Sequence, residues 1–285
     1  MSERPAQSQP YPGESGEMTP EPRDEMRDYT GRGLLEGKRA LVTGGDSGIG
    51  RAVAIGLAKE GADVAITYLK EDTDARRTKE LVEKEGRRCL TLHGDMAEER
   101  HTREAVRRVA EEFGRIDVLI LHHGTQKPVE DVREITTEQL ERTFRVNVLS
   151  LFWTVQEALD HMPDGGSIVV TGSINGLRGN KSLIDYSASK AAAMNFAPVH
   201  GAGAARPGHP RQLRGAGPGM DAAHPGDVRR GAGGELRRAV ADGPGGRARR
   251  DRPVVRLLRQ QPALLLLHRA EPRARRRRGP PGLTE

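Results

Sequence analysis

The sequence predicts an α/β protein built on a doubly wound parallel sheet over about two thirds of its 285 residues. Short apolar runs alternate with longer helical patterns, and several of these patterns end on glycine. A glycine-rich turn also joins the first apolar run to the helix after it. Apolar strands separated by helices are typical of parallel sheets that are covered on both faces.

Five apolar runs have the length of buried strands. The helical segments between them end at Gly61, Gly86 and Gly114, where glycine can adopt the left-handed conformation that closes a helix. The sequence therefore predicts one βα unit for each run. The runs are RALVTG, DVAITY, RCLTLHGD, DVLILHHG and SIVVTG, which begin at residues 39, 63, 88, 117 and 167.

Composition divides the chain into three parts. Residues 1–33 are rich in Pro, Gly, Glu and Ser and have little to bury, so we expect an extended or disordered arm. Residues 34–197 hold the predicted domain. Residues 198–285 contain 19 Arg, 15 Gly and 11 Pro but no Ile, Phe, Trp or Tyr, the residues that buried strands require. We expect a disordered basic tail there, in place of the C-terminal strands of the sheet.

Charge is distributed unevenly along the chain. Residues 1–197 carry 27 Lys and Arg against 33 Asp and Glu, whereas residues 198–285 carry 19 Arg against 7 acids, so the net charge of +6 comes from the tail. The single cysteine, Cys89, excludes an internal disulfide and fits a reducing compartment. No apolar run resembles a signal peptide or has the ~20 residues of a membrane helix. We expect a cytoplasmic protein without a membrane partner.

The segment TGGDSGIG at residues 43–50 follows the first predicted strand and opens the first helix. A strand, a glycine-rich turn and a helix N-terminus together form an anion site, because backbone N–H groups and the helix dipole face a pyrophosphate. The alternative is an ordinary glycine-rich βα loop. The spacing of Gly44, Gly48 and Gly50 favours dinucleotide binding.

Four further residues are candidates for catalysis. Tyr186 and Lys190 lie four residues apart in YSASK, on one face of a helix, where the ammonium would lower the pKa of the phenol. Ser173 follows the strand SIVVTG, at the sheet edge that binds ligands in α/β proteins, unless it is only a turn or cap serine. Asn147 interrupts the apolar segment FRVNVLS as a site residue or as a structural hydrogen-bonding group. No metal site is expected.

The glycine motif, Asn147, Ser173 and the Tyr-x-x-x-Lys pair resemble, in order and spacing, the short-chain dehydrogenase/reductase family over about residues 34–197. The leader QPYPGESGEMTPEP and the segment TGGDSGIGRAVAIGLAKEGADVAITYL are similar to its glucose and ribitol dehydrogenase-like branch. The resemblance implies a Rossmann-like domain that uses NADP or NAD to interconvert a small-molecule alcohol and a carbonyl compound. It also implies a homotetramer.

The resemblance implies a role for each catalytic residue. Tyr186 exchanges the hydroxyl proton of the substrate, and Ser173 hydrogen-bonds its carbonyl oxygen. Lys190 binds the nicotinamide ribose and tunes the tyrosine, while Asn147 supports a proton-relay water. The cofactor carries the hydride. The expected cofactor-binding residues are Thr43, Gly44, Asp46, Ser47, Gly48, Ile49, Gly50, Tyr68, Asp95, Met96 and Gly124.

The sequence departs from the family pattern in two places. The NNAG motif of the family corresponds to LHHG at residues 121–124. We interpret His122 and His123, for which the sequence identifies no partner, as a loop substitution that weakens packing on the adenine side. The acid that holds the 2′-OH of NAD about 20 residues beyond the glycine motif is missing. Tyr68 lies near the position expected for this acid, and Lys70 is close by in the sequence. The sequence therefore favours NADP over NAD.

The tail has the composition of out-of-frame sequence. Read one base later with GC-rich codons, residues 209–228 become IRVNCVAPGPVWTPLIPATF and residues 253–269 become PSYVFFASNQLSSYYTG, which look like missing strands and loops of the family. Codon degeneracy permits part of this agreement, although Met220 has one codon and must become Trp. We therefore expect that a frameshift near Ala197 replaced the last third of a dehydrogenase, and that this chain has little activity.

Two alternatives remain. The basic tail could bind nucleic acid through its arginines, although it lacks the aromatic residues that stack on bases. The chain could also be a nucleotide-binding remnant without turnover.

Sequencing the coding DNA around codon 197 tests the frameshift. The expected result is a base inserted or lost there, with the shifted reading restoring family-like sequence downstream. An intact in-frame gene, with a protein whose intact mass includes the tail, would refute this explanation.

Overall fold

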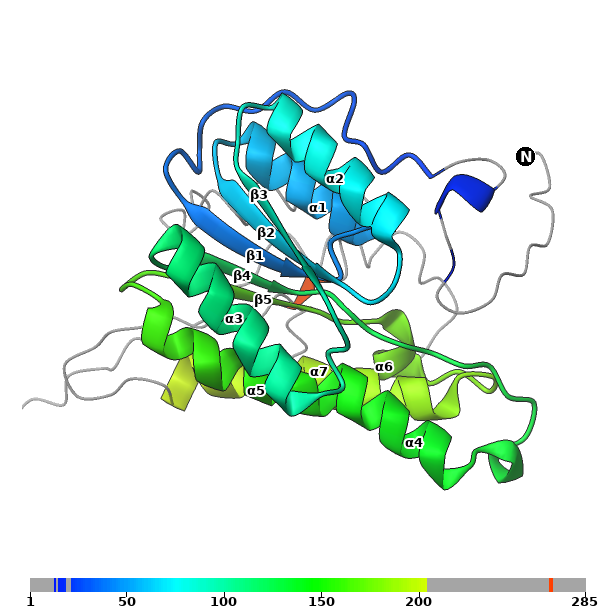
Figure 1. The fold of residues 1–285 in the computed structure, drawn as a ribbon. Helices are drawn as coiled ribbons and strands as arrows, with labels where there is room; N and C mark the ends of the chain where they lie inside the picture. Colours follow the sequence, from blue (N-terminus) through cyan, green and yellow to red (C-terminus); the bar gives the residue numbers. More distant parts are fainter. Residues whose placement is uncertain (1–12, 14, 19–21, 204–266, 269–285) are drawn as a thin grey trace, which may run out of the picture.

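The structure is a computed structural model that describes residues 13, 15–18, 22–203 and 267–268. Its centre is a sheet whose parallel strands follow the order β3-β2-β1-β4-β5 (Figure 1). The strand order reverses between β1 and β4, as in doubly wound sheets, so the predicted fold class is confirmed. The strands are β1 (Arg39–Thr43), β2 (Asp63–Tyr68), β3 (Cys89–His93), β4 (Val118–Leu121) and β5 (Ser167–Thr171).

Helices cover both faces of this sheet. In Figure 1, α1 and α2 lie on one face, and α3, α5 and α7 lie on the other. The helices are α1 (Gly48–Lys59), α2 (Asp72–Lys84), α3 (Glu99–Phe113), α4 (Thr137–Phe144), α5 (Ser150–Ala158), α6 (Ile174–Arg178) and α7 (Ile184–Gly203). A π-helical turn (Arg145–Leu149) joins α4 to α5, and short 3-10 turns are formed by Ser15–Glu17, Val132–Glu134 and Leu159–His161.

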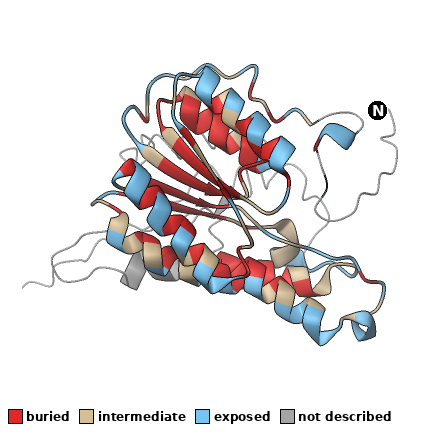
Figure 2. Ribbon diagram, viewed as in Figure 1, coloured by how far each residue is buried: buried red, intermediate tan, exposed pale blue. Residues whose placement is uncertain are grey.

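Both faces of the sheet are buried, as the continuous apolar runs predicted. On β1, Ala40 and Val42 belong to the core under α1 and α2, whereas Leu41 belongs to the core under α3 and α5. This alternation follows from the two-residue period of a strand. Figure 2 shows the strands buried along their length and the helices buried on their inner sides only.

The predicted helix ends are also confirmed. Gly61, Gly86 and Gly114 have φ angles of +98°, +73° and +79°, in the region that favours glycine. Gly114 is the left-handed cap of α3, and its N–H donates to the carbonyl of Ala110. The spacing of these glycines therefore fixes where three helices turn back towards the sheet.

Residues 22–33 pack against the domain although they form no helix or strand. The fully buried carboxylate of Glu60, at the end of α1, accepts hydrogen bonds from the N–H groups of Arg32 at 3.0 Å and Leu34 at 2.9 Å, and from the Tyr29 hydroxyl. Burial would raise the pKa of Glu60, but these hydrogen bonds outweigh burial and lower it. Of the two expectations for the arm, extended or disordered, the structure favours the first for residues 22–33, which are fastened by these polar contacts and by the buried side chain of Met26.

The C-terminal boundary also differs from the prediction. The helix α7 continues beyond residue 197, so the predicted end of the domain falls inside a helix. Leu267–His268 form β6, antiparallel to the end of β5, and the expectation that the tail adds no strand is wrong for these two residues. Pairing of this kind uses backbone groups, which composition does not report. The predicted disorder of the remaining tail falls on residues 204–266 and 269–285, outside the described part.

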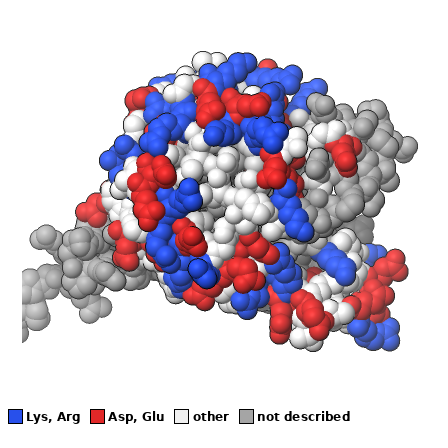
Figure 3. Space-filling view, viewed as in Figure 1, with Lys and Arg blue, Asp and Glu red and all other residues white. Residues whose placement is uncertain are grey.

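The described surface is mixed in charge. On the face drawn in Figure 3, Lys and Arg are interspersed with Asp and Glu. Exposed ion pairs of this kind contribute little to stability. Within the part of the chain that the structure describes, no helix combines the length and apolarity needed to cross a bilayer.

Replacing Glu60 with Ala should lower the free energy of unfolding by about 2 kcal/mol, because two N–H groups lose a buried acceptor. Urea unfolding followed by circular dichroism measures this change. The matched control is Glu111→Ala on the exposed side of α3, expected to change stability by less than about 0.5 kcal/mol. Equal unfolding midpoints for the two variants would show that Glu60 does not fasten the N-terminal segment.

Candidate functional site

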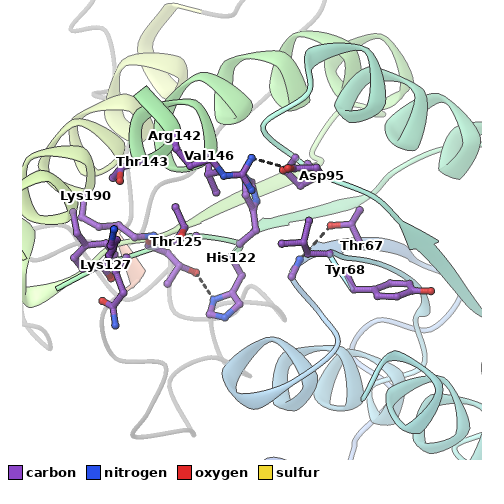
Figure 4. A pocket seen from close by; sticks show the side chains of 18 of the residues that line it. Thr67, Tyr68, Asp95, His122, Thr125, Lys127, Arg142, Thr143, Val146 and Lys190 are labelled. Carbon is purple, nitrogen blue, oxygen red and sulfur yellow. Dashed lines mark hydrogen bonds and ion pairs between the residues drawn. The ribbon is translucent and has the colours of Figure 1, made fainter. Parts of the chain in front are cut away.

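A pocket of about 1140 Å³ lies at the carboxyl ends of the parallel strands. Figure 4 shows that it extends from Tyr68 and Asp95 at one end to Lys127 and Lys190 at the other, with His122 between them. Ligands of open α/β sheets bind at this edge, where the strand order reverses. The predicted site residues that line the pocket are Gly44, Asp46, Ser47, Ile49, Tyr68, Asp95, Met96, Gly124, Ser173, Tyr186 and Lys190.

The turn between β1 and α1 is closed by its glycines. Gly44 and Gly48 have φ angles of +67° and +53°. A Cβ on Gly50 would lie 1.8 Å from the carbonyl oxygen of Gly44, so no larger residue fits without a shift of the backbone. Thr43 lies behind this turn, where its hydroxyl donates to the carbonyl of Ile120 at 3.3 Å. A turn this tight lets the backbone approach a ligand closely, and it fits the pyrophosphate of a dinucleotide.

The end of β2 presents a phenol to the pocket. The Tyr68 hydroxyl donates to Asp72 at 2.7 Å, and burial together with this bond raises the pKa of Tyr68 to about 12. Asp46 and Glu71 line the same end of the pocket and are both buried. Burial, and then the neighbouring Glu71 carboxylate, raise the pKa of Asp46 to about 6.

The end of β3 carries an ion pair. The Asp95 carboxylate accepts a hydrogen bond from Arg142 of α4 at 2.6 Å and another from the N–H of Ala97 at 2.8 Å. These bonds outweigh burial and lower the pKa of Asp95. In Figure 4 the pair closes one side of the pocket near Val146. Asp95 is therefore ionised and fixed in orientation.

Ser173 caps the helix α6 and also lines the pocket. Its hydroxyl oxygen accepts the N–H of Asn175 at 3.2 Å, which makes Ser173 the N-cap of α6. A serine hydroxyl that accepts one hydrogen bond can still donate its own proton. The cap interpretation is thus correct, and it leaves Ser173 able to donate into the pocket that it lines.

Tyr186 and Lys190 lie on the same side of α7, as their spacing predicted. The ammonium nitrogen of Lys190 is 5.9 Å from the ring centroid of Tyr186, and it donates to the carbonyl of Thr171 at 3.2 Å. Burial lowers the pKa of Lys190 to about 8. The end of β5 therefore holds the lysine at the pocket wall beside the tyrosine.

Asn147 lies behind the pocket, in the π-helical turn between α4 and α5. Its amide donates to the carbonyl of Thr125 and to the hydroxyl of Ser189, both at 2.9 Å, and its oxygen accepts the N–H of Thr125 at 2.8 Å. A Cβ on Gly124 would lie 3.3 Å from both the Asn147 oxygen and the Lys190 nitrogen. Asn147 thus fixes the loop after β4 beside the lysine, and π-turns of this kind are frequent at functional sites.

The two histidines after β4 have partners that the sequence did not identify. Both nitrogens of His123 are hydrogen-bonded at 2.6 Å, one to Thr43 and the other to Ser150. His122 lies 3.1 Å from the Thr171 hydroxyl. The rings thus join the loop after β4 to β1, β5 and α5. The expected weaker packing on the adenine side stays a prediction. Burial, followed by the Lys190 charge, lowers the pKa of His122 to about 4 and that of His123 to about 3.

Asp185 is a buried residue next to the site, outside the pocket lining, whose supporting role was not predicted from the sequence. Its carboxylate is 2% exposed and accepts hydrogen bonds from the Thr143 hydroxyl at 2.7 Å, the Gln139 amide at 3.2 Å and the Tyr186 N–H at 2.9 Å. Its position directly before the tyrosine was the available signal. Asp185 fastens α4 to the start of α7, where the tyrosine lies.

Comparison with known families agrees with this geometry. Residues 38–206 match the family model described as short chain dehydrogenase, which is more than half of the chain. The chain therefore belongs to the short-chain dehydrogenase family. The predicted resemblance is confirmed for this part.

Particular relatives cover a similar share of the sequence. General stress protein 39 of Bacillus subtilis is 49% identical over 195 residues, which are 68% of this chain and 68% of the relative. The chloroplastic NADPH-dependent aldehyde reductase 1 of Arabidopsis thaliana is 41% identical over 65% of this chain and 66% of its own length. A short chain dehydrogenase from Burkholderia cenocepacia, solved in complex with NADP, has a TM-score of 0.57 and 40% identity, covering 58% of this chain and 68% of that chain. The chain thus spans about two thirds of the length of these relatives.

Acid should destabilise the protein through His123. Its pKa is about 3 in the folded state against 6.5 when unperturbed, so the unfolded chain binds a proton more tightly as the pH falls from 6.5 towards 3. At pH 5 this difference costs up to about 2 kcal/mol. Urea unfolding at pH 7.5 and pH 5 should therefore show a smaller loss in His123→Asn than in the wild type.

The control for this experiment is His93→Asn, since His93 is exposed at the end of β3. It should lose as much stability between the two pH values as the wild type does. An equal loss in the His123 variant would mean that this ring does not resist protonation.

Proposed function

We propose that the protein binds NADP(H), in preference to NAD(H), and interconverts an alcohol and a carbonyl compound through Ser173, Tyr186 and Lys190. The observation that carries the proposal is that these side chains line the same pocket as the glycine turn of residues 44–49. The nicotinamide ring of a dinucleotide bound at the glycine turn would then lie close to Tyr186. The relatives whose names include NADP or NADPH support the choice of cofactor.

A dinucleotide held by the glycine turn, Asp95 and Gly124 would supply the hydride for reduction of the carbonyl carbon. The Tyr186 hydroxyl donates its proton to the carbonyl oxygen, so one hydride and one proton convert the carbonyl group into an alcohol. Ser173 donates a hydrogen bond to the same oxygen, where negative charge develops as the hydride arrives. In the direction of oxidation, Tyr186 accepts the proton of the alcohol.

Lys190 and Asn147 support the tyrosine in this proposal. The lysine ammonium lies 5.9 Å from the centroid of the Tyr186 ring, close enough for its positive charge to stabilise negative charge that develops on the substrate side of the site during proton transfer. Burial lowers the pKa of Lys190 to about 8. This value is still above neutral pH, so most of the lysine side chains carry their positive charge at pH 7. Asn147 holds the loop after β4 beside this lysine and supports a water that returns the proton to Tyr186.

The cofactor preference rests on the end of β2. An acid that would accept the ribose 2′-OH of NAD is replaced there by Tyr68, whose hydroxyl is bonded to Asp72. Lys70 follows two residues later; it is exposed beside the pocket and not part of its lining, and the proposal assigns its positive charge to a 2′-phosphate. The remaining cofactor contacts are proposed for the glycine turn, Asp95, Met96 and Gly124.

Turnover by this chain is expected to be slow. The chain spans about two thirds of its relatives, and the family match ends at residue 206. The substrate and the homotetramer implied by the resemblance stay predictions. Nucleic-acid binding by the tail concerns residues outside the described part.

The proposal is tested by measuring NADPH binding through its fluorescence, and NADPH oxidation with small aldehydes. The wild type should bind NADPH. Tyr186→Phe should bind it within about threefold of the wild type but should lose ~10²-fold or more of any oxidation, since it lacks the proton donor. NADH, measured in the same way, should bind more weakly.

The other outcomes separate the alternatives. A wild type that binds NADPH without oxidising it is the nucleotide-binding remnant. A wild type that binds neither nucleotide contradicts the proposal. The exposed Thr30 in the N-terminal segment provides a neutral variant, Thr30→Ala, which should match the wild type in both measurements.

A further inference from the structure

The N-terminal segment reaches the glycine turn through one buried carboxylate. Asp24 is 6% exposed, and its Oδ2 accepts the backbone N–H of Gly48 at 2.8 Å. The same oxygen accepts a hydrogen bond from Arg51 at 3.2 Å. Asp24 therefore contacts the start of α1 at two points, one on the backbone and one on a side chain.

Arg51 joins the turn to α2. Its guanidinium is 4% exposed and donates to the carbonyl of Asp46 at 3.0 Å, inside the glycine turn. It also donates to the Asp74 carboxylate at 2.6 Å and to the Thr78 hydroxyl at 3.0 Å, both on α2. A buried arginine needs acidic partners, and Asp24 supplies one of the two.

The start of α1 lacks its usual cap. Ser47 stands at the N-cap position, but its side chain makes no capping hydrogen bond. A cap normally satisfies one of the first free N–H groups of a helix. Asp24, from a distant segment, takes this place at Gly48. Its negative charge also suits the positive end of the helix dipole.

Asp24 binds the turn from behind the pocket. Ser47 and Ile49, on either side of Gly48, line the pocket, whereas the N–H of Gly48 is directed to Asp24. Of the backbone groups in this turn, the Asp24 carboxylate occupies only the N–H of Gly48, so the backbone of Ser47 and Ile49 remains available to a ligand. Arg51 forms ion pairs with both Asp24 and Asp74, so it offsets only part of their negative charge. Gly13, nearer the N-terminus, also lines the pocket.

We propose that Asp24 is a positioning residue for the dinucleotide: by holding the Gly48 N–H and Arg51, it keeps the turn of residues 44–50 in the form that binds the pyrophosphate. The proposal rests on the proposed cofactor. It assigns to the N-terminal segment a part in cofactor affinity, in addition to its contacts with the domain. Releasing Asp24 lets the turn open, so that its N–H groups no longer converge on the phosphates.

Hydrogen exchange in the protein without nucleotide tests the positioning itself. In Asp24→Ala, amide exchange in the peptide that covers the glycine turn should rise ~10-fold, because one buried bond and one ion pair are lost. Asp28→Ala is the matched control, since Asp28 lies exposed in the same segment. It should exchange like the wild type. An unchanged turn peptide in Asp24→Ala would overturn the proposal.

Cofactor binding tests the consequence. The Kd for NADPH should rise ~10-fold in Asp24→Ala, which corresponds to about 1.4 kcal/mol of binding free energy. Asp24→Asn keeps an oxygen that can accept the Gly48 N–H, so its Kd should return to within about threefold of the wild type. A purely structural role would predict equal losses for the two variants. Equal Kd values for wild type and Asp24→Ala would also overturn the proposal.

Should Asp24→Ala not fold, it is replaced by a protein with the recognition sequence of a site-specific protease inserted after Arg27 and cut there in the folded state. The Arg27 side chain is 79% exposed, and cleavage there separates Asp24 from the domain. Exchange in the turn peptide should rise after the cut, and no change would count against the proposal. Failure of the wild type to bind NADPH contradicts the proposed function instead, and the exchange measurement still decides the role of Asp24.

Discussion

The close approach within the β1–α1 turn is the constraint on which the rest of the structure depends. The Cα of Gly50 passes so near the Gly44 carbonyl that a side chain has no room. The same β1–α1 turn packs against the loop after β4, where a Cβ on Gly44 would be 3.0 Å from the Cα of His123. Every other part of the pocket is arranged around these contacts, because the loops after β2, β3, β4 and β5 meet at the same edge of the sheet.

Polar groups buried around this turn are stabilised in pairs. His123 is neutral and bonded on both nitrogens, and Lys190 donates to a strand carbonyl. Arg51 donates to the carbonyl of Asp46 and to the carboxylates of Asp24 and Asp74. Buried polar groups that are fully bonded fix the geometry of a site, since each costs free energy once a partner is lost. The apolar sheet therefore provides the core on which the site is built, and hydrogen bonds fix the positions of its side chains.

The sequence predicted the parts that follow from local periodicity. The five strands, the glycine caps, and the placement of Tyr186 and Lys190 on one helix face depend on spacings of a few residues. It missed the burial of Asp24, the role of Asp185 and the partners of His123. These contacts join residues that are far apart in the chain, and their polar side chains have no periodic signature. The two-residue strand β6 was missed because backbone pairing is independent of side-chain type.

The pairing of Leu267–His268 with β5 has a consequence for the edge of the sheet. It engages β5 only at Val170 and Thr171. Ile168 and Val169, buried on both faces as in an interior strand, face that side of the sheet with no ladder partner among the described residues. Among the described residues this part of the β5 edge is unpaired, and an unpaired apolar edge strand can accept a further strand through its backbone groups.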